Sequence, residues 1–140
     1  MTAKEFLRQA YKLDELIKSN QEELKSLKEL SISIGGIDYS KDRVQSSRTS
    51  GDAGFTNIIL QITELEKKIH ADFEKLFSIK LQIRTAINEV QDQAEKVLLR
   101  DKYINFHTWD EISDALEVSI RTIHRIHAAA LKNIKIPDTD

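Results

Sequence analysis

Hydrophobic residues recur every three or four positions along most of this chain, the spacing of one face of an α-helix. From about residue 2 to residue 30 they follow a heptad that only Asn20 interrupts. The two columns are Phe6, Leu13, Asn20 and Leu27, and Ala10, Ile17 and Leu24. Charged residues fill most of the other positions. The pattern predicts a long amphipathic helix that buries one face.

A second stretch with helical spacing, from about residue 57 to residue 93, contains neither glycine nor proline. Its apolar positions are Ile58, Ile62, Leu65, Ile69, Leu76, Ile79, Ile83, Ile87 and Val90. Helices of roughly 40 and 55 Å need partners for their apolar faces. An antiparallel hairpin is favoured because one loop returns the chain, while a coiled-coil dimer would use the same faces. Asn20 would either fix the register or the oligomeric state, or be a position near a helix end with access to solvent.

Residues 31–54, between these stretches, contain all four glycines of the chain and six serines. They predict a loop, and a loop of this length is usually functional or disordered. As a contact arm it would grip phosphates with Lys41, Arg43 and Arg48. As a flexible tether it would only need its serines for solubility, and three nearby aspartates favour this interpretation by offsetting the basic charge.

Composition narrows the class of protein. With 40% hydrophobic and 31% charged residues, 140 residues suit one or two small domains rather than a disordered chain. The absence of cysteine excludes disulfides and thiolate metal sites. No apolar run reaches the roughly 20 residues that span a bilayer, and charges occupy the N-terminus, so a cytoplasmic protein is expected.

The C-terminal part predicts three short helices. The first, about residues 94–103, is expected to continue the second long helix and to bury Val97, Leu98 and Tyr103. Thr108 followed by Glu111 has the spacing of a capping box that begins the next helix. The expected inner face of that helix is Trp109, Ile112, Ala115 and Leu116, with Ala115 small enough to let the following helix approach closely.

The last helix is expected to begin after Ser119, a favourable N-cap, and to bury Ile123, Ile126 and Ala130. Projection at about 100° per residue places Arg121, Arg125, Ala128 and Lys132 on the opposite side, flanked by Thr122 and His124. Charge is also segregated, between the last two predicted helices. Residues 108–118 carry four acids and no lysine or arginine, and residues 119–136 carry four lysines or arginines and no acid.

Such a face is typical of a recognition helix in the major groove of double-stranded DNA, where arginine bonds guanine edges and lysine contacts phosphate. The helix N-terminus behind Ser119 would add to phosphate attraction. The expected DNA-binding residues are Ser119, Arg121, Thr122, His124, Arg125 and Lys132. The alternative is a solvated basic face on a bundle helix.

These residues also carry a resemblance. Residues 94–132, with the run WDEISDALEVSIRTIHRIHAAAL, resemble the helix-turn-helix of sigma factor region 4. The TAKEFLRQ start, the DRVQSS segment and the sigma-like C-terminus, in this order, resemble a family of small phage and prophage proteins of unknown function. The resemblance implies phage transcription control, as by ArpU-like regulators, with Arg121, Thr122, His124 and Arg125 in the base-reading stretch. Nothing resembles sigma region 2, so a complete sigma factor is not expected.

Catalysis has little support in the sequence. His124 and His127 are three residues apart and could share a metal in principle, but no third ligand is suggested, and a core or phosphate-facing histidine is favoured. No glycine-rich phosphate loop, HExxH motif or nucleophile elbow is present. No enzyme, cofactor or metal is expected.

The sequence therefore predicts an all-α protein with two domains. Residues 1–93 would form a long antiparallel, coiled-coil-like helical hairpin, and residues 94–136 a helix-turn-helix that binds DNA. The expected function is sequence-specific regulation of phage or prophage transcription by a homodimer, with residues 119–132 reading the major groove and RNA polymerase as a possible further partner. The alternative is a non-enzymatic adaptor whose hairpin and sigma-like module bind RNA polymerase or another protein.

Overall fold

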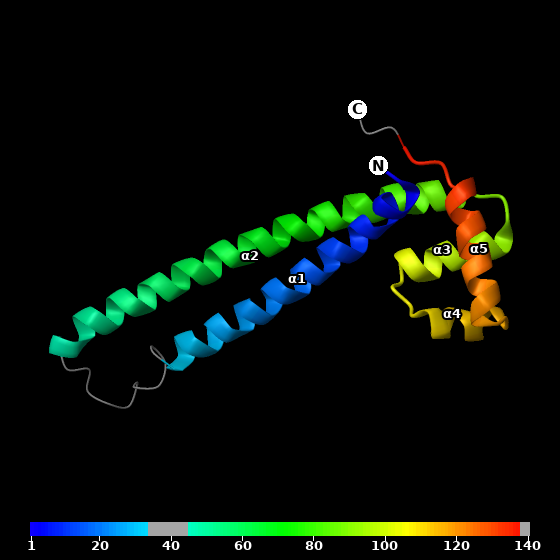
Figure 1. The fold of residues 1–140 in the computed structure, drawn as a ribbon. Helices are drawn as coiled ribbons and strands as arrows, with labels where there is room; N and C mark the ends of the chain where they lie inside the picture. The colour runs from blue at the N-terminus through cyan, green and yellow to red at the C-terminus, as the bar shows by residue number, and fades with distance from the viewer. Residues whose placement is uncertain (34–44, 138–140) are drawn as a thin grey trace. The chain divides into compact units, whose positions relative to one another are not determined.

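A computed structural model describes residues 1–33 and 45–137 of the chain. Within this part, all regular secondary structure is helical, as the sequence predicts (Figure 1). The helices are α1 (Ala3–Ser31), α2 (Gln45–Asn88), α3 (Gln93–Tyr103), α4 (Trp109–Leu116) and α5 (Ile120–Asn133). None of these helices contains a segment long and apolar enough to cross a bilayer.

The chain divides into two compact units. One consists of Glu15–Glu74, and the other combines Met1–Asp14 with Lys75–Asp140. The domain boundary expected at residue 93 falls inside the second of these units. The start of α1 and the end of α2 therefore belong with α3, α4 and α5.

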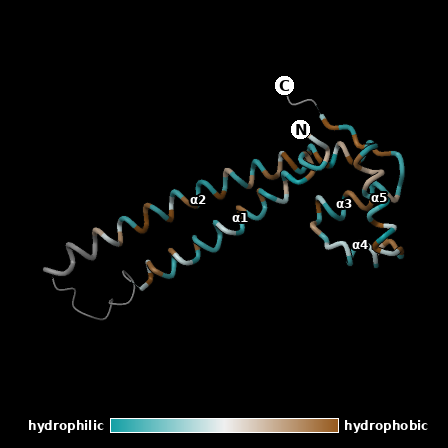
Figure 2. The backbone as a smooth tube through the Cα atoms, viewed as in Figure 1, coloured by the Kyte–Doolittle hydropathy of each residue, from teal (hydrophilic) through white to brown (hydrophobic). Residues whose placement is uncertain are grey.

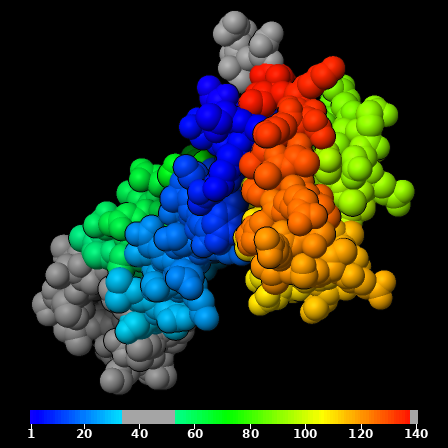
Figure 3. All heavy atoms as spheres, turned by 45° about the vertical axis from the view of Figure 1, so that its right-hand side comes forward, coloured from blue at the N-terminus to red at the C-terminus, as the bar shows by residue number. Residues whose placement is uncertain are grey.

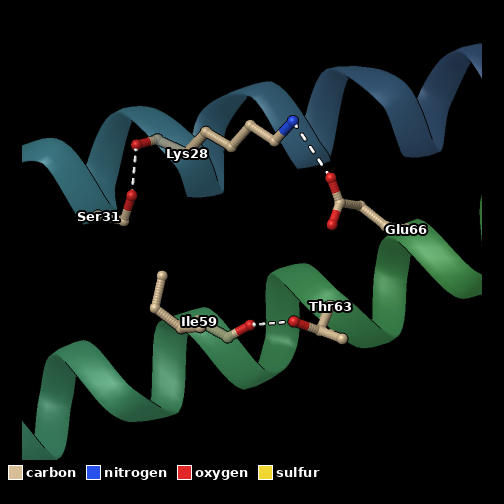
Figure 4. Close-up of polar contacts among 5 residues, drawn as sticks. All are labelled: Lys28, Ser31, Ile59, Thr63 and Glu66. Atoms are coloured by element: carbon tan, nitrogen blue, oxygen red, sulfur yellow. Dashed lines mark hydrogen bonds and ion pairs between the residues drawn. The ribbon is translucent and has the colours of Figure 1, made fainter.

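In the unit Glu15–Glu74, α1 and α2 lie side by side, and hydrophobic residues recur along both helices (Figure 2). Ile17, Ile58, Ile62 and Ile69 are buried, as the heptad and its continuation predict. Lys28 Nζ on α1 lies 3.3 Å from Glu66 Oε2 on α2 (Figure 4). Both side chains are about half exposed, so this pair contributes at most about 1 kcal/mol and burial of the isoleucines dominates.

Asn20 interrupts the apolar face of α1, as expected. Its Nδ2 is buried and has no hydrogen-bond partner among the described residues. An unsatisfied buried amide costs about 1–3 kcal/mol. This placement disfavours the interpretation that Asn20 is simply open to solvent.

The beginning of α2 corrects a prediction. Helix α2 begins at Gln45 rather than near residue 57, so residues 45–54 are helical instead of part of a loop. Glycine weakens a helix by about 1 kcal/mol relative to alanine. Once the apolar segment has nucleated the helix, however, each further residue adds a hydrogen bond at little extra cost. Lys41 and Arg43 of the proposed contact arm lie outside the described residues.

The expected continuity between the second long helix and the next one is wrong. Helix α2 ends at Asn88 and α3 begins at Gln93, where the Asp92 carboxylate accepts a hydrogen bond from the Glu95 N–H at 3.0 Å. This N-cap competes with continued helix because aspartate satisfies the free N–H groups of a helix start. Across the break, Arg100 Nη2 donates to Asn88 Oδ1 at 3.0 Å.

Helices α3, α4 and α5 pack against one another in the second unit. The fully buried residues at their centre are Leu98, Leu99, Ile112, Ile123 and Ala130. Four of these five were expected, and only Leu99 was not. Five other expected core residues differ: Val97, Trp109, Leu116 and Ile126 are half-buried, and Ala115 is exposed.

A polar contact joins the two outer ends of α3 and α5 in this helical core. Asn133 Nδ2 near the end of α5 donates to Glu95 Oε1 near the start of α3 at 2.9 Å. Glu95 is 8% exposed, and among the described residues it is the one charged residue that is buried. A carboxylate is tolerated there because the Asn133 amide satisfies it.

The first turns of α1 belong to the same unit. Thr2 and Glu5 exchange backbone-to-side-chain hydrogen bonds of 3.4 and 3.1 Å, which begins the helix. Phe6, Leu7 and Ala10 are then almost completely buried.

Candidate nucleic-acid interface

Helix α4 begins with the predicted capping box. The Glu111 N–H donates to Thr108 Oγ1 at 3.1 Å, and the Thr108 N–H donates to Glu111 Oε1 at 2.8 Å. Hydrogen bonds from Thr108, chiefly from its backbone, lower the pKa of the Glu111 carboxyl. The start of α4 is thereby fixed by two reciprocal contacts.

The turn between α4 and α5 depends on Glu117. Its backbone is left-handed, with φ 57° and ψ 43°. This conformation lets the Val118 N–H reach the Ser113 carbonyl at 3.2 Å, and the Ser113 hydroxyl donates to the Val118 carbonyl. Such contacts close the C-terminus of a helix and reverse the chain.

Helix α5 begins at the predicted N-cap, Ser119. The Ser119 Oγ accepts from the Thr122 N–H at 3.2 Å and lies 3.0 Å from Thr122 Oγ1. Both hydroxyls are therefore engaged at the cap, and Thr122 is half-buried. Of the expected DNA-binding residues, these two stabilise the helix that presents the others.

The remaining expected residues lie on one exposed stripe of α5. Its members are Arg121, His124, Arg125, Ala128 and Lys132, all of which are exposed. Spacings of three and four residues place them along one side of the helix. Buried Ile123 and Ala130 mark the opposite side. The described residues include no acidic partner within ion-pair distance of the three cations. Figure 3 draws the atoms of α5 as spheres in orange to red.

His124 is held on one side by an aromatic ring of α4. Its ring centroid lies 5.1 Å from that of Trp109, in a tilted arrangement. The same Trp109 ring meets His127 edge-on at 4.9 Å and lies beneath Lys102 Nζ at 4.4 Å. Trp109 therefore joins the exposed stripe to the end of α3.

His127 points inward, as expected. Its Nε2 lies 2.6 Å from the hydroxyl oxygen of Tyr103, and the two rings stack. Burial, followed by repulsion from nearby cations, lowers the pKa of His127 to about 4. The ring is thus neutral at pH 7. No group of three or more potential metal ligands occurs in the described part of the chain.

Sequence reasoning missed Lys102 as well as Lys4 and Arg8, two cations of α1 that line a cavity together with Trp109. Lys102 was within reach of sequence analysis because it lies in the basic last turn of α3. Lys4 and Arg8 were not, because nothing in a helical pattern shows which distant segment contacts the end of a short helix.

Comparison with known families gives one match. The family model described as a protein of unknown function, DUF1492, matches residues 31–135, which is most of the chain. Neither the curated proteins nor the solved structures gave a match. The chain belongs to this family of proteins of unknown function.

Proposed function

We propose that this protein is a sequence-specific double-stranded DNA-binding regulator of phage or prophage transcription. In this proposal α4, the turn at Glu117 and α5 form a sigma region 4-like helix-turn-helix. Helix α5 enters the major groove as the recognition helix. Helices α1 and α2 form an antiparallel hairpin that serves for dimerisation or for docking a partner such as RNA polymerase.

The observation that carries the proposal is the exposed stripe of α5. Arginine binds guanine O6 and N7 through two parallel hydrogen bonds, so Arg121 and Arg125 are suited to read bases. Lys132, seven residues further on, is suited to contact a backbone phosphate. Small Ala128 between them lets the helix backbone approach the groove closely.

Structural support lies beneath the stripe. A recognition helix must be rigid to hold its side chains in register with base edges. Ser119 caps α5, and Ile123 and Ala130 are fully buried against the neighbouring helices. The net charge of −2 does not oppose the proposal, because no acid lies between residues 119 and 136.

The test is selection of binding sites from a genomic fragment library at about physiological salt. The native protein should enrich a discrete motif, and Arg121→Ala with Arg125→Ala should lose it, at roughly 1–3 kcal/mol per arginine. A palindromic motif would indicate a dimer. The matched control is Lys12→Ala with Lys25→Ala, which removes two exposed charges from α1 and should retain the motif. Absence of any enriched motif with native protein would refute the proposal.

One observation favours the adaptor alternative. Leu60 and Phe73 on α2 are 57% and 44% exposed, although helices of soluble proteins usually direct such side chains inward. An adaptor that binds RNA polymerase or another protein through α2 would cover them. Such a protein would show little salt dependence in nucleic-acid binding, whereas phosphate contacts give a steep one.

A further inference from the structure

A cavity of about 410 Å³ lies within the unit that contains both ends of the described chain. Its lining combines residues of α1, the end of α3, the segment between α3 and α4, the start of α4, and α5, namely Lys4, Arg8, Tyr11, Lys102, Tyr103, Phe106, His107, Thr108, Trp109 and His127. Three of these residues are cations and none is an aspartate or glutamate. Binding pockets have volumes of this order, from about 300 Å³.

One cation of the lining, Lys102, is held in place by an aromatic ring. Lys102 Nζ lies 4.4 Å from the centroid of Trp109. Phe106 is contacted edge-on by Tyr11, with centroids 5.5 Å apart, and Lys80 Nζ lies 4.8 Å from its centroid. Cation–π contacts fix ammonium groups without neutralising them. The positive charge therefore remains available to a ligand.

Repulsion within the cavity supports the same conclusion. Burial and the positive charge of Arg8 both lower the pKa of Lys102. Arg8 is thus close enough to destabilise the charge of Lys102, and no carboxylate of the lining relieves this. A bound anion would remove the repulsion and gain charge-assisted hydrogen bonds.

The chemistry of the lining selects among anions. Arginine bonds a phosphate through two parallel N–H groups, and lysine adds a mobile point charge. An organic substituent on that phosphate would meet the exposed ring of Tyr11. We propose that Lys4, Arg8 and Lys102 form a phosphate-ester site. Its ligand is either a backbone phosphate of bound DNA or a free phosphorylated molecule.

If the ligand is a backbone phosphate of bound DNA, the site deepens the proposed function, and this part of the inference rests on that function. Trp109 contacts both Lys102 and His124, so the cavity adjoins the exposed stripe of α5. A duplex whose major groove holds α5 would then have a backbone phosphate near the start of α4. The N-terminal turns of α1 would enlarge the DNA footprint beyond the helix-turn-helix.

The experiment has two arms, both with the full chain. In the first, thermal unfolding is measured with inorganic phosphate and with chloride at equal ionic strength. Phosphate should raise the Tm of the native protein, and Lys4→Gln with Arg8→Gln and Lys102→Gln should abolish the rise. The matched control, Lys12→Gln with Lys25→Gln and Lys67→Gln, removes three exposed helix charges outside the cavity and should keep it.

In the second arm, the salt dependence of DNA binding is compared for the same proteins. If the cavity holds backbone phosphate, the triple cavity variant should lower the slope of log K against log salt by roughly 2–3, since each contact contributes about 0.9. The DNA sequence that the triple cavity variant prefers should be the same as that of the native protein. An unchanged slope with a phosphate-dependent Tm would identify a free phosphate ester as the ligand.

The two arms distinguish a failure of the phosphate-site proposal from a failure of the proposed DNA-binding function. Native protein that binds no DNA would overturn the regulator, while the first arm would still report on the cavity. The phosphate site would be overturned if phosphate did not raise the Tm of the native protein and the triple cavity variant did not change the slope. Arg8→Gln alone, which leaves Lys102 on Trp109, should halve the phosphate effect or more, and circular dichroism should show native helix content in every variant.

Discussion

The hydroxyl oxygen of Tyr103 lies 2.6 Å from Nε2 of His127, and this contact determines which nitrogen of the imidazole carries the proton. Burial raises the pKa of Tyr103 to about 12, so its O–H remains intact and can donate. The neutral His127 ring must then accept at Nε2 and carry its hydrogen on Nδ1. The pair connects α3 to α5 beneath the exposed stripe.

This pair predicts a pH dependence of stability. Since the pKa of His127 is lowered from 6.5 to about 4 on folding, the unfolded chain takes up the proton first as pH falls. The stability from the neutral ring is complete above pH 6.5 and is lost between pH 6.5 and 4. Because the ring is only half-buried, we expect a loss of roughly 1–2 kcal/mol.

Urea unfolding of the native protein and of His127→Gln from pH 7 to pH 4 measures this loss. The native protein should fall more steeply than the variant, whose amide retains an acceptor for Tyr103. His70→Gln, a control for an exposed histidine of α2, should follow the native profile. Parallel profiles for the native protein and His127→Gln would contradict the prediction.

The left-handed backbone at Glu117 predicts a stabilising substitution. Any residue with a Cβ costs about 1–2 kcal/mol there, and glycine does not. We expect Glu117→Gly to raise the free energy of unfolding by about 0.5–1 kcal/mol after the greater freedom of glycine in the unfolded chain is included.

Chemical denaturation of Glu117→Gly and Glu117→Ala tests the cause of this effect. Alanine removes the same carboxylate from the negative end of α4 but keeps the Cβ. Glycine should therefore be the more stable of the two. Equal stabilities would show that backbone strain at this turn is negligible.

The contact between Glu95 and Asn133 predicts a large effect of a small change. Asn133→Ala leaves the Glu95 carboxylate buried without its amide donor, and we expect a loss of about 1–3 kcal/mol. In a double-mutant cycle with Glu95→Gln, the two losses should be less than additive. Strict additivity would mean that the contact contributes nothing to stability.

Local rules account for much of the fold. The capping box at Thr108, the Ser119 cap and the inner residues of α5 depend on neighbours three or four positions away, so a sequence pattern contains them. The Asp92 cap obeys the same rule, and its spacing from Glu95 was an available signal for the α2–α3 break. The exposed stripe of α5 was predicted because one buried face determines the other.

Contacts between distant segments were beyond such reasoning. Lys4 and Lys102 line the same cavity although they are far apart in the chain, and no periodicity relates them. The start of α2 at Gln45 was missed for another reason. Helix propagation across a weak segment depends on the cooperativity of the whole helix, which local glycine and serine content does not measure.

The unit that joins residues 1–14 to residues 75–137 has a consequence for synthesis. Phe6, Leu7 and Ala10 emerge from the ribosome long before the helices of their own unit have been made. Until then these apolar side chains lack their native cover, and contacts of such high sequence separation form slowly. The nascent chain is therefore most exposed to chaperones and to aggregation until α5 has left the exit tunnel.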